Sequence, residues 1–79
     1  MSNLLIIKEM AKVVCMQFAD NGALKEIREV YKSPYLIPVK EVFQDFYESF
    51  SEDYFVESWN DFVFSVPALN CVYVLRDLD

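Results

Sequence analysis

The sequence predicts one domain over residues 1–79 that is mainly α-helical, with three to four short amphipathic helices and a C-terminal β-strand. Apolar side chains recur at the helical period over most of the chain, and one β-branched run of strand length lies near its end. The alternative is an α+β fold with a small sheet that a second copy could complete. A chain of this length has room for a single domain only.

The first predicted helix covers about Asn3–Asp20. Its polar positions fall within about a third of the helical circumference, and apolar residues cover most of the remainder. A helix that is apolar around more than half of its girth is buried on two sides or lies at an interface. Asn21 and Gly22 would then end the helix as a left-handed C-cap.

The second predicted helix covers about Ala23–Lys32, with apolar residues on one face and charged residues on the other. A rival interpretation makes Asp20, Asn21 and Gly22 the turn of a β-hairpin. We prefer the helix, because the residues after the turn follow a helical period better than a two-residue one.

The segment 33–38 is predicted to be a linker, with Pro38 in the first turn of a third helix that extends from Val39 to about Phe50. A fourth helix is predicted over about Asp53–Phe64. The apolar faces of these two helices are half a turn out of phase. The chain is therefore expected to break near Ser51, which is also a suitable N-cap for the fourth helix.

The run from Cys71 to Leu75 is predicted to be a strand. It must pair with Tyr35–Ile37, with the N-terminal segment, or with the same strand of another copy, because a lone strand cannot satisfy its backbone. Together with the apolar first helix, this need predicts a homodimer. Cys15 and Cys71 each lie in an apolar run and are expected to be buried free thiols.

The sequence contains no residue pattern that is typical of catalysis or of cofactor binding. It has no histidine, which excludes a histidine general base. A single glycine argues against a phosphate-binding loop, and two distant cysteines argue against a zinc site. The segment Ser49–Asp53 has carboxylates but lacks the central glycine of a calcium loop. We therefore expect a protein that is not an enzyme and needs no metal or cofactor.

No part of the sequence resembles a targeting signal. The apolar run Leu4–Ile7 is interrupted by Lys8 and Glu9 and has no basic leader before it, so neither a signal peptide nor a membrane span is expected. We expect a cytoplasmic protein that does not bind membranes.

Charge is distributed unevenly along the chain. Residues 1–40 carry six basic and four acidic side chains, a balance of +2, whereas residues 41–79 carry one basic and nine acidic side chains, a balance of −8. Seven carboxylates and no cation occur from Glu41 through Asp61. Like charges three and four residues apart destabilise a helix by a few tenths of a kcal/mol per pair, so such a stripe carries a cost. An acidic face that serves only solvation remains the simpler alternative.

Carboxylates interleaved with tyrosines suit the docking of a basic protein surface, because tyrosine is a frequent interface anchor and charge steers the encounter. The candidate partner-binding residues are the seven carboxylates and two neighbouring tyrosines: Glu41, Asp45, Glu48, Glu52, Asp53, Glu57, Asp61, Tyr47 and Tyr54. A strongly basic partner surface would normally bind nucleic acid.

In size, acidity and lack of catalytic residues, the chain resembles the small phage-type inhibitors that mimic DNA, such as the uracil-DNA glycosylase inhibitors and the overcome-restriction protein. This resemblance in size and charge implies a non-enzymatic inhibitor that blocks the nucleic-acid-binding surface of a basic host protein and does not itself bind nucleic acid. The partner could be a histone-like HU protein, an RNA polymerase or a nuclease. The alternatives are an antitoxin or immunity protein that covers a toxin's basic cleft, and a structural adaptor whose acidic face is only solvation.

Overall fold

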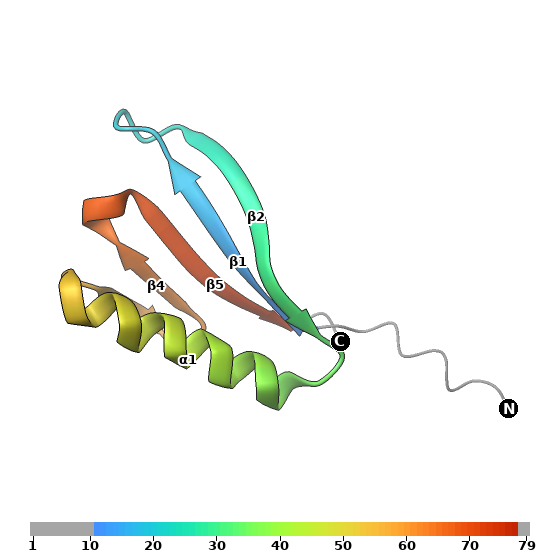
Figure 1. Ribbon diagram of the computed structural model, residues 1–79. Helices are drawn as coiled ribbons and strands as arrows, with labels where there is room; N and C mark the ends of the chain where they lie inside the picture. The colour runs from blue at the N-terminus through green and yellow to red at the C-terminus, as the bar shows by residue number, and fades with distance from the viewer. Residues whose placement is uncertain (1–10, 78–79) are drawn as a thin grey trace, which may run out of the picture.

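The computed structural model describes residues 11–77, which form an antiparallel β-sheet with one α-helix across one of its faces (Figure 1). In chain order the elements are β1 (Ala11–Phe18), β2 (Leu24–Ser33), α1 (Leu36–Asp53), β3 (Glu57–Asn60), β4 (Val63–Val66), a 3-10 turn (Pro67–Leu69) and β5 (Cys71–Asp77). The strand order is β2-β1-β5-β4-β3, and all neighbours are antiparallel. The prediction of a mainly α-helical fold is therefore wrong, and the α+β alternative is closer.

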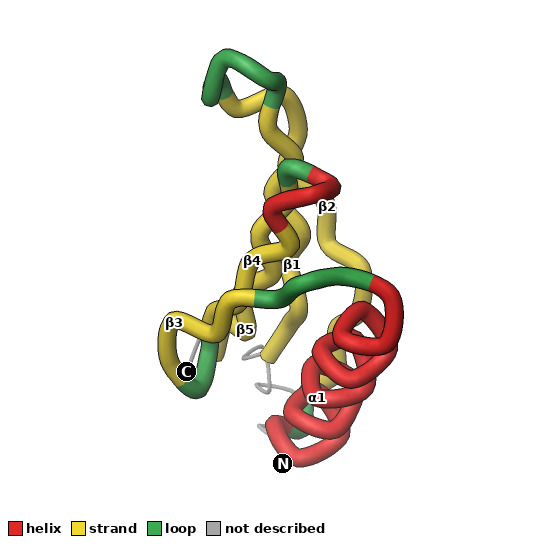
Figure 2. Tube along the Cα trace, turned by 90° about the vertical axis from the view of Figure 1, so that its left-hand side faces the viewer, coloured by secondary structure: helices red, strands yellow, loops and turns green. Residues whose placement is uncertain are grey.

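The helix connects the two edge strands of the sheet, β2 and β3. It consequently crosses the whole sheet on one side, and the other side carries no helix among the described residues (Figures 1 and 2). This one-sided cover defines the two surfaces of the molecule: the outer face of α1 and the open face of the sheet.

The first predicted helix is wrong where the structure describes it, because Ala11–Phe18 is strand β1; residues 3–10 of that prediction lie outside the described part. β1 is an inner strand, between β2 and β5. Ala11, Val13 and Cys15 belong to the core under α1, whereas Val14 is buried outside that core. An inner strand with two apolar faces has apolar residues on all sides, which a helical projection cannot distinguish from a helix buried all round.

The second predicted helix is also wrong, and the rival hairpin is correct. The turn is closed by Gly22, which has a φ of +91°, and by Asn21, whose Oδ1 accepts a hydrogen bond from the backbone N–H of Ala23 (2.9 Å). The register between β1 and β2 shifts twice. One shift places Leu24 and Ile27, three residues apart, opposite residues of β1 that are only two apart. Such bulges impose a spacing of three on a strand and so imitate a helical period.

The third predicted helix is confirmed over its length, although α1 begins at Leu36 and ends at Asp53. Pro38 lies in its first turn, as predicted. The predicted break at Ser51 is misplaced, because Ser51 is helical and its hydroxyl donates to the carbonyl of Tyr47 (2.7 Å). The helix ends one turn later, at the extended residue Tyr54.

The fourth predicted helix is wrong, because this part of the chain is the β3–β4 hairpin. Its tight connection is supported by Asn60, whose Oδ1 accepts a hydrogen bond from the backbone N–H of Phe62 (2.7 Å). A register shift between Ser58 and Asn60 again breaks the two-residue alternation that would have marked a strand.

The C-terminal strand is confirmed, and it occupies the centre of the sheet as β5. It pairs with the N-terminal strand β1 and with β4, not with Tyr35–Ile37, which belongs largely to α1. The two reasons for predicting a homodimer, an all-round apolar helix and an unpaired strand, therefore do not hold.

The core lies between α1 and the covered face of the sheet. The helix contributes Val39 and Phe43, which face Phe64 and Tyr73 of the central strands. The rings of Phe64 and Tyr73 are nearly parallel, with centroids 5.3 Å apart. Burial of large aromatic rings supplies much of the hydrophobic free energy that so short a chain can gain.

Both cysteines are buried free thiols in this core, as predicted. Burial, with the neighbouring Cys15 as a smaller cause, raises the pKa of the Cys71 thiol to about 11. A thiol that resists ionisation is a poor nucleophile, so Cys71 serves packing.

Candidate protein-binding surface

The outer face of α1 carries a row of carboxylates. Val39 and Phe43 lie on the side of the helix that packs into the core, so the residues on the opposite side face solvent. All five carboxylates of the helix are exposed. We call them the acidic face of α1: Glu41, Asp45, Glu48, Glu52 and Asp53.

The acidic face forms no ion pair within the described residues, although Lys40 lies on the same helix. The ion pairs of the described residues all lie on β1 and β2: Glu29 pairs with Lys12 and Lys32, and Glu26 pairs with Arg28. On α1 the one side-chain hydrogen bond to a carboxylate comes from the neutral amide of Gln44, which donates to Glu48 (3.1 Å). The face therefore presents its full negative charge to a partner.

The carboxylates also oppose the helix macrodipole. The first turn of α1 has no acidic residue and its last turn has no basic residue, while Glu52 and Asp53 lie at the C-terminal end. Negative charge near a helix C-terminus is unfavourable by about 0.3–1 kcal/mol at an exposed site. This arrangement is the reverse of the one that would stabilise the helix.

The remaining predicted site residues do not form a second helical stripe. Glu57 lies on β3, the edge strand, and Asp61 lies in the connection to β4. Tyr47 is half-buried, with its ring set edge-on to Phe64 (5.5 Å, 76°), whereas Tyr54 is exposed at the end of α1. Only the carboxylates of α1 thus form an uninterrupted surface.

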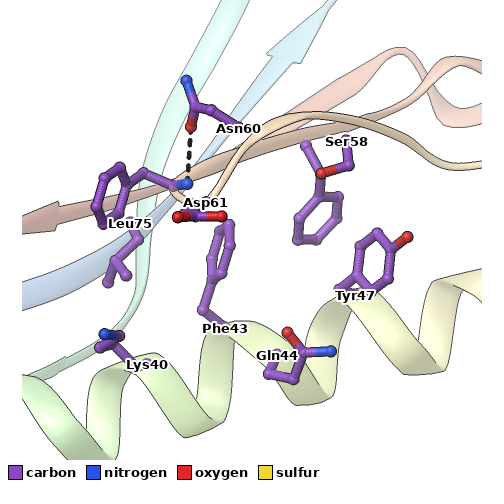
Figure 3. Close-up of a pocket in the computed structure, with 10 residues that line it drawn as sticks. Lys40, Phe43, Gln44, Tyr47, Ser58, Asn60, Asp61 and Leu75 are labelled. Carbon is purple, nitrogen blue, oxygen red and sulfur yellow. Dashed lines mark hydrogen bonds between the residues drawn. The ribbon is translucent and has the colours of Figure 1, made fainter.

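A groove opens between α1 and the β3–β4 connection, beside the acidic face (Figure 3). It has a volume of about 430 Å³. Phe43, Phe64 and Leu75 provide apolar walls, and Lys40 and Asp61 contribute charge from opposite sides. Its complete lining comprises Lys40, Phe43, Gln44, Tyr47, Ser58, Asn60, Asp61, Phe62, Phe64 and Leu75.

The chemical groups that line the groove are few. Asn60 is held by the hydrogen bond that its Oδ1 accepts within the turn, and the lining contains no cysteine, histidine or second carboxylate to work with Asp61. Within residues 11–77, no three of the histidine, cysteine, aspartate and glutamate side chains gather as metal ligands would. The lining is mixed: the rings of Phe43 and Phe64 lie beside polar groups such as Gln44 and Ser58. Such a groove has room for one amphipathic side chain of a partner.

Sequence reasoning did not find this groove. Lys40 and Gln44 were placed on one helix and Asp61 on another, so nothing indicated that they would share a cavity. Asn60 is the one local signal that could have predicted the turn, because an asparagine side chain readily accepts a hydrogen bond from the backbone two residues later.

Comparisons with known proteins gave no match: no family model, curated protein or solved structure proved significantly similar to this chain. In the described part of the chain, no helix combines the length and the apolar character needed to cross a membrane.

Proposed function

We propose that the protein is a non-enzymatic binding protein whose acidic face of α1 covers a basic, nucleic-acid-binding surface of a partner protein. The observation that carries this proposal is the run of five exposed carboxylates on one helix with no cation against them. Their mutual repulsion lowers stability, and so does the position of Glu52 and Asp53 at the negative end of the macrodipole. A binding role explains why a short chain retains such a face.

The size of the face limits what it can imitate. From Glu41 to Glu52 the helix rises about 16 Å, so the four main charges are roughly 5 Å apart. Duplex DNA presents one charge per about 1.7 Å of axis, or 3.4 Å for each strand. The face therefore matches a few phosphates of one strand, and we expect a small basic patch on the partner, of the kind found on a nucleoid protein or a nuclease.

The groove beside the face can supply an anchor for the partner. Its apolar walls would take one aliphatic or aromatic side chain, while Asp61 could accept a hydrogen bond from a basic one. Charge would then steer the encounter and the groove would fix the register.

The experiment uses the whole protein as bait with bacterial lysate, beside the triple variant Glu41→Lys, Asp45→Lys and Glu48→Lys. A retained protein supports the proposal when the triple variant loses it and when duplex DNA competes for it. The single variant Asp45→Lys has Glu26→Lys as its matched control. Each reverses one exposed carboxylate, but Glu26 lies on β2, away from the acidic face. Partners that bind the triple variant unchanged would contradict the proposal.

A further inference from the structure

The face of the sheet opposite α1 is mainly apolar, and no second helix or sheet of the described residues packs on it. Alternation along the strands turns Val13, Cys15 and Tyr73 toward the helix, so that Val14, Met16 and Val72 point the other way. At the sheet edges Ile27 is 58% exposed and Trp59 62% exposed. We call this surface the open face: Val14, Met16, Phe18, Leu24, Ile27, Trp59, Val63, Ser65, Val72 and Val74.

The register arranges the open face in rows across the strands. One row consists of residues that are direct neighbours across all five strands: Ile27, Met16, Val72, Ser65 and, at the β3 edge, Glu57. The next row contains Val14, Val74 and Val63. These two rows form a continuous apolar centre, with Trp59 at its β3 edge.

The polar groups of this centre are satisfied within the chain. The indole N–H of Trp59 donates to Oγ of Ser65 (3.0 Å), and Ser65 is only 9% exposed. A second surface can therefore cover the centre of the open face without leaving a buried donor or acceptor unpaired.

Charges of opposite sign lie at the two ends of the open face, and Glu57 and Glu29 lie at its β3 and β2 edges. At one end Lys12 and Arg76 are neighbours across β1 and β5, and Lys32 is opposite Lys12. Glu29 partly offsets them through its hydrogen bond from Lys12 (2.6 Å). At the other end Asp20 follows β1 and accepts a hydrogen bond from Asn70 (2.9 Å).

We propose that the open face packs against the open face of a second copy of the chain, about a two-fold axis that runs along the row of Met16 and Val72. Met16 lies four residues from Lys12 and four from Asp20. This axis therefore brings the cationic end of one copy to the level of Asp20 of the other. A two-fold axis parallel to the strands would instead place the cationic ends together.

The dimensions of the face are sufficient for a weak dimer. Five strands span roughly 19 Å, and the seven residues from Lys12 to Phe18 rise about 20 Å in six steps. Because β3 and β4 have only four residues each, each copy covers at most roughly 400 Å² in projection. Side-chain relief makes the accessible area larger, which places the interface at the small end of specific ones. We expect dissociation in the micromolar range.

A nucleic acid is a less suitable occupant, although aromatic and basic residues occur together on this face. The chain has a net charge of −6, which repels phosphates. The central rows are aliphatic, whereas single strands bind to stacked aromatic platforms. The proposal also does not rest on the acidic face of α1, which lies on the other side of the sheet, so the two can fail separately.

The first test is sedimentation equilibrium from low micromolar to near-millimolar concentration, with Trp59 emission followed in parallel. We expect a mass that approaches twice the 9.3 kDa of one chain, and a blue shift of Trp59 as the second copy excludes water. Ile27→Glu should weaken the dimer by about tenfold or more, because two carboxylates then meet across the axis. The matched control is Ile37→Glu, since Ile37 is 70% exposed but lies on α1.

A monomer at every concentration would overturn the proposal, and so would equal weakening by the two glutamate variants. A blue shift of Trp59 emission when a single-stranded oligonucleotide is added to a protein that stays monomeric would assign the face to nucleic acid instead.

The orientation of the two copies is tested by charge exchange. Asp20→Arg and Arg76→Asp should each weaken the dimer, and their combination should restore it; a combination that stays weak would exclude this axis.

Discussion

The ring of Phe43 on α1 lies 5.1 Å from the ring of Phe64 on β4, at an interplanar angle of 53°. Phe43 and Val39 are the buried residues of the helix. The partly buried rings of Phe46, Tyr47 and Phe50 add further contacts with the sheet. The acidic face is therefore positioned by the same aromatic contacts that close the core.

Replacement of Phe43 by alanine should remove a large part of the stability of the domain. Loss of a buried phenylalanine costs about 3–5 kcal/mol, whereas small domains are stable by only about 5–15 kcal/mol. Urea unfolding followed by circular dichroism measures the loss. Phe55→Ala is the matched control, because Phe55 is 73% exposed and should change stability by less than about 0.5 kcal/mol. Equal losses in the two variants would contradict this account of the core.

Stability should fall in alkaline solution because of Cys71. The thiol has an ordinary pKa of 9.0, and burial raises its pKa to about 11 in the folded protein. Below pH 9 the thiol is neutral in both states, so its full contribution is present. As the pH rises through 9 toward 11, the unfolded chain loses the proton first, and the free energy of unfolding decreases.

Urea unfolding of the wild type and of Cys71→Ala, at pH values below 9 and near 11, measures this dependence. The variant should lose less stability over the interval. Tyr73, whose pKa is also raised, mainly by burial, should leave a residual slope in both proteins. Identical slopes would exclude Cys71 as a cause.

The sequence predicts α1 and β5 well for a physical reason. α1 buries one stripe and exposes the other, which is the pattern that a 3.6-residue period detects. β5 alternates between the core and the open face, and its β-branched residues favour a strand. Both elements therefore follow local rules.

The other strands could not be read from local periodicity. β1 is apolar on both faces, and bulges in β2 and β3 impose spacings of three residues on strands. The acidic face was predictable because it lies within one helix, whereas the groove joins Lys40 to Asp61 through a long-range fold. Contacts of that kind depend on strand order, which single residues do not encode.

Gly22 should be costly to replace, although a side chain would meet no neighbour there. No heavy atom lies within 4 Å of the position that a Cβ would take, so the effect is conformational alone. At a φ of +91°, alanine should destabilise the domain by about 1–2 kcal/mol. Thermal unfolding of Gly22→Ala measures this, with Gly22→Asn as the milder comparison because asparagine tolerates positive φ. A neutral alanine variant would show that the hairpin turn adopts another conformation.

The last prediction concerns the cost of the acidic face. Glu52→Lys and Asp53→Lys place a cation in the last turn of α1, where the structure has none. Each reversal should raise stability by about 0.3–1 kcal/mol, since it removes an unfavourable interaction with the macrodipole and adds a favourable one. For a domain of this size 1 kcal/mol corresponds to roughly 4–8 °C in Tm. Asp45→Lys, near the middle of the helix, is the control that lacks a dipole contribution.

The gain in stability should shrink in concentrated salt, which screens exposed charges. The same two reversals should weaken binding to a basic partner, so stability and binding would change in opposite directions. Were the end-of-helix variants no more stable than Asp45→Lys at low salt, the carboxylates would carry no cost, and the acidic face would be no more than solvation.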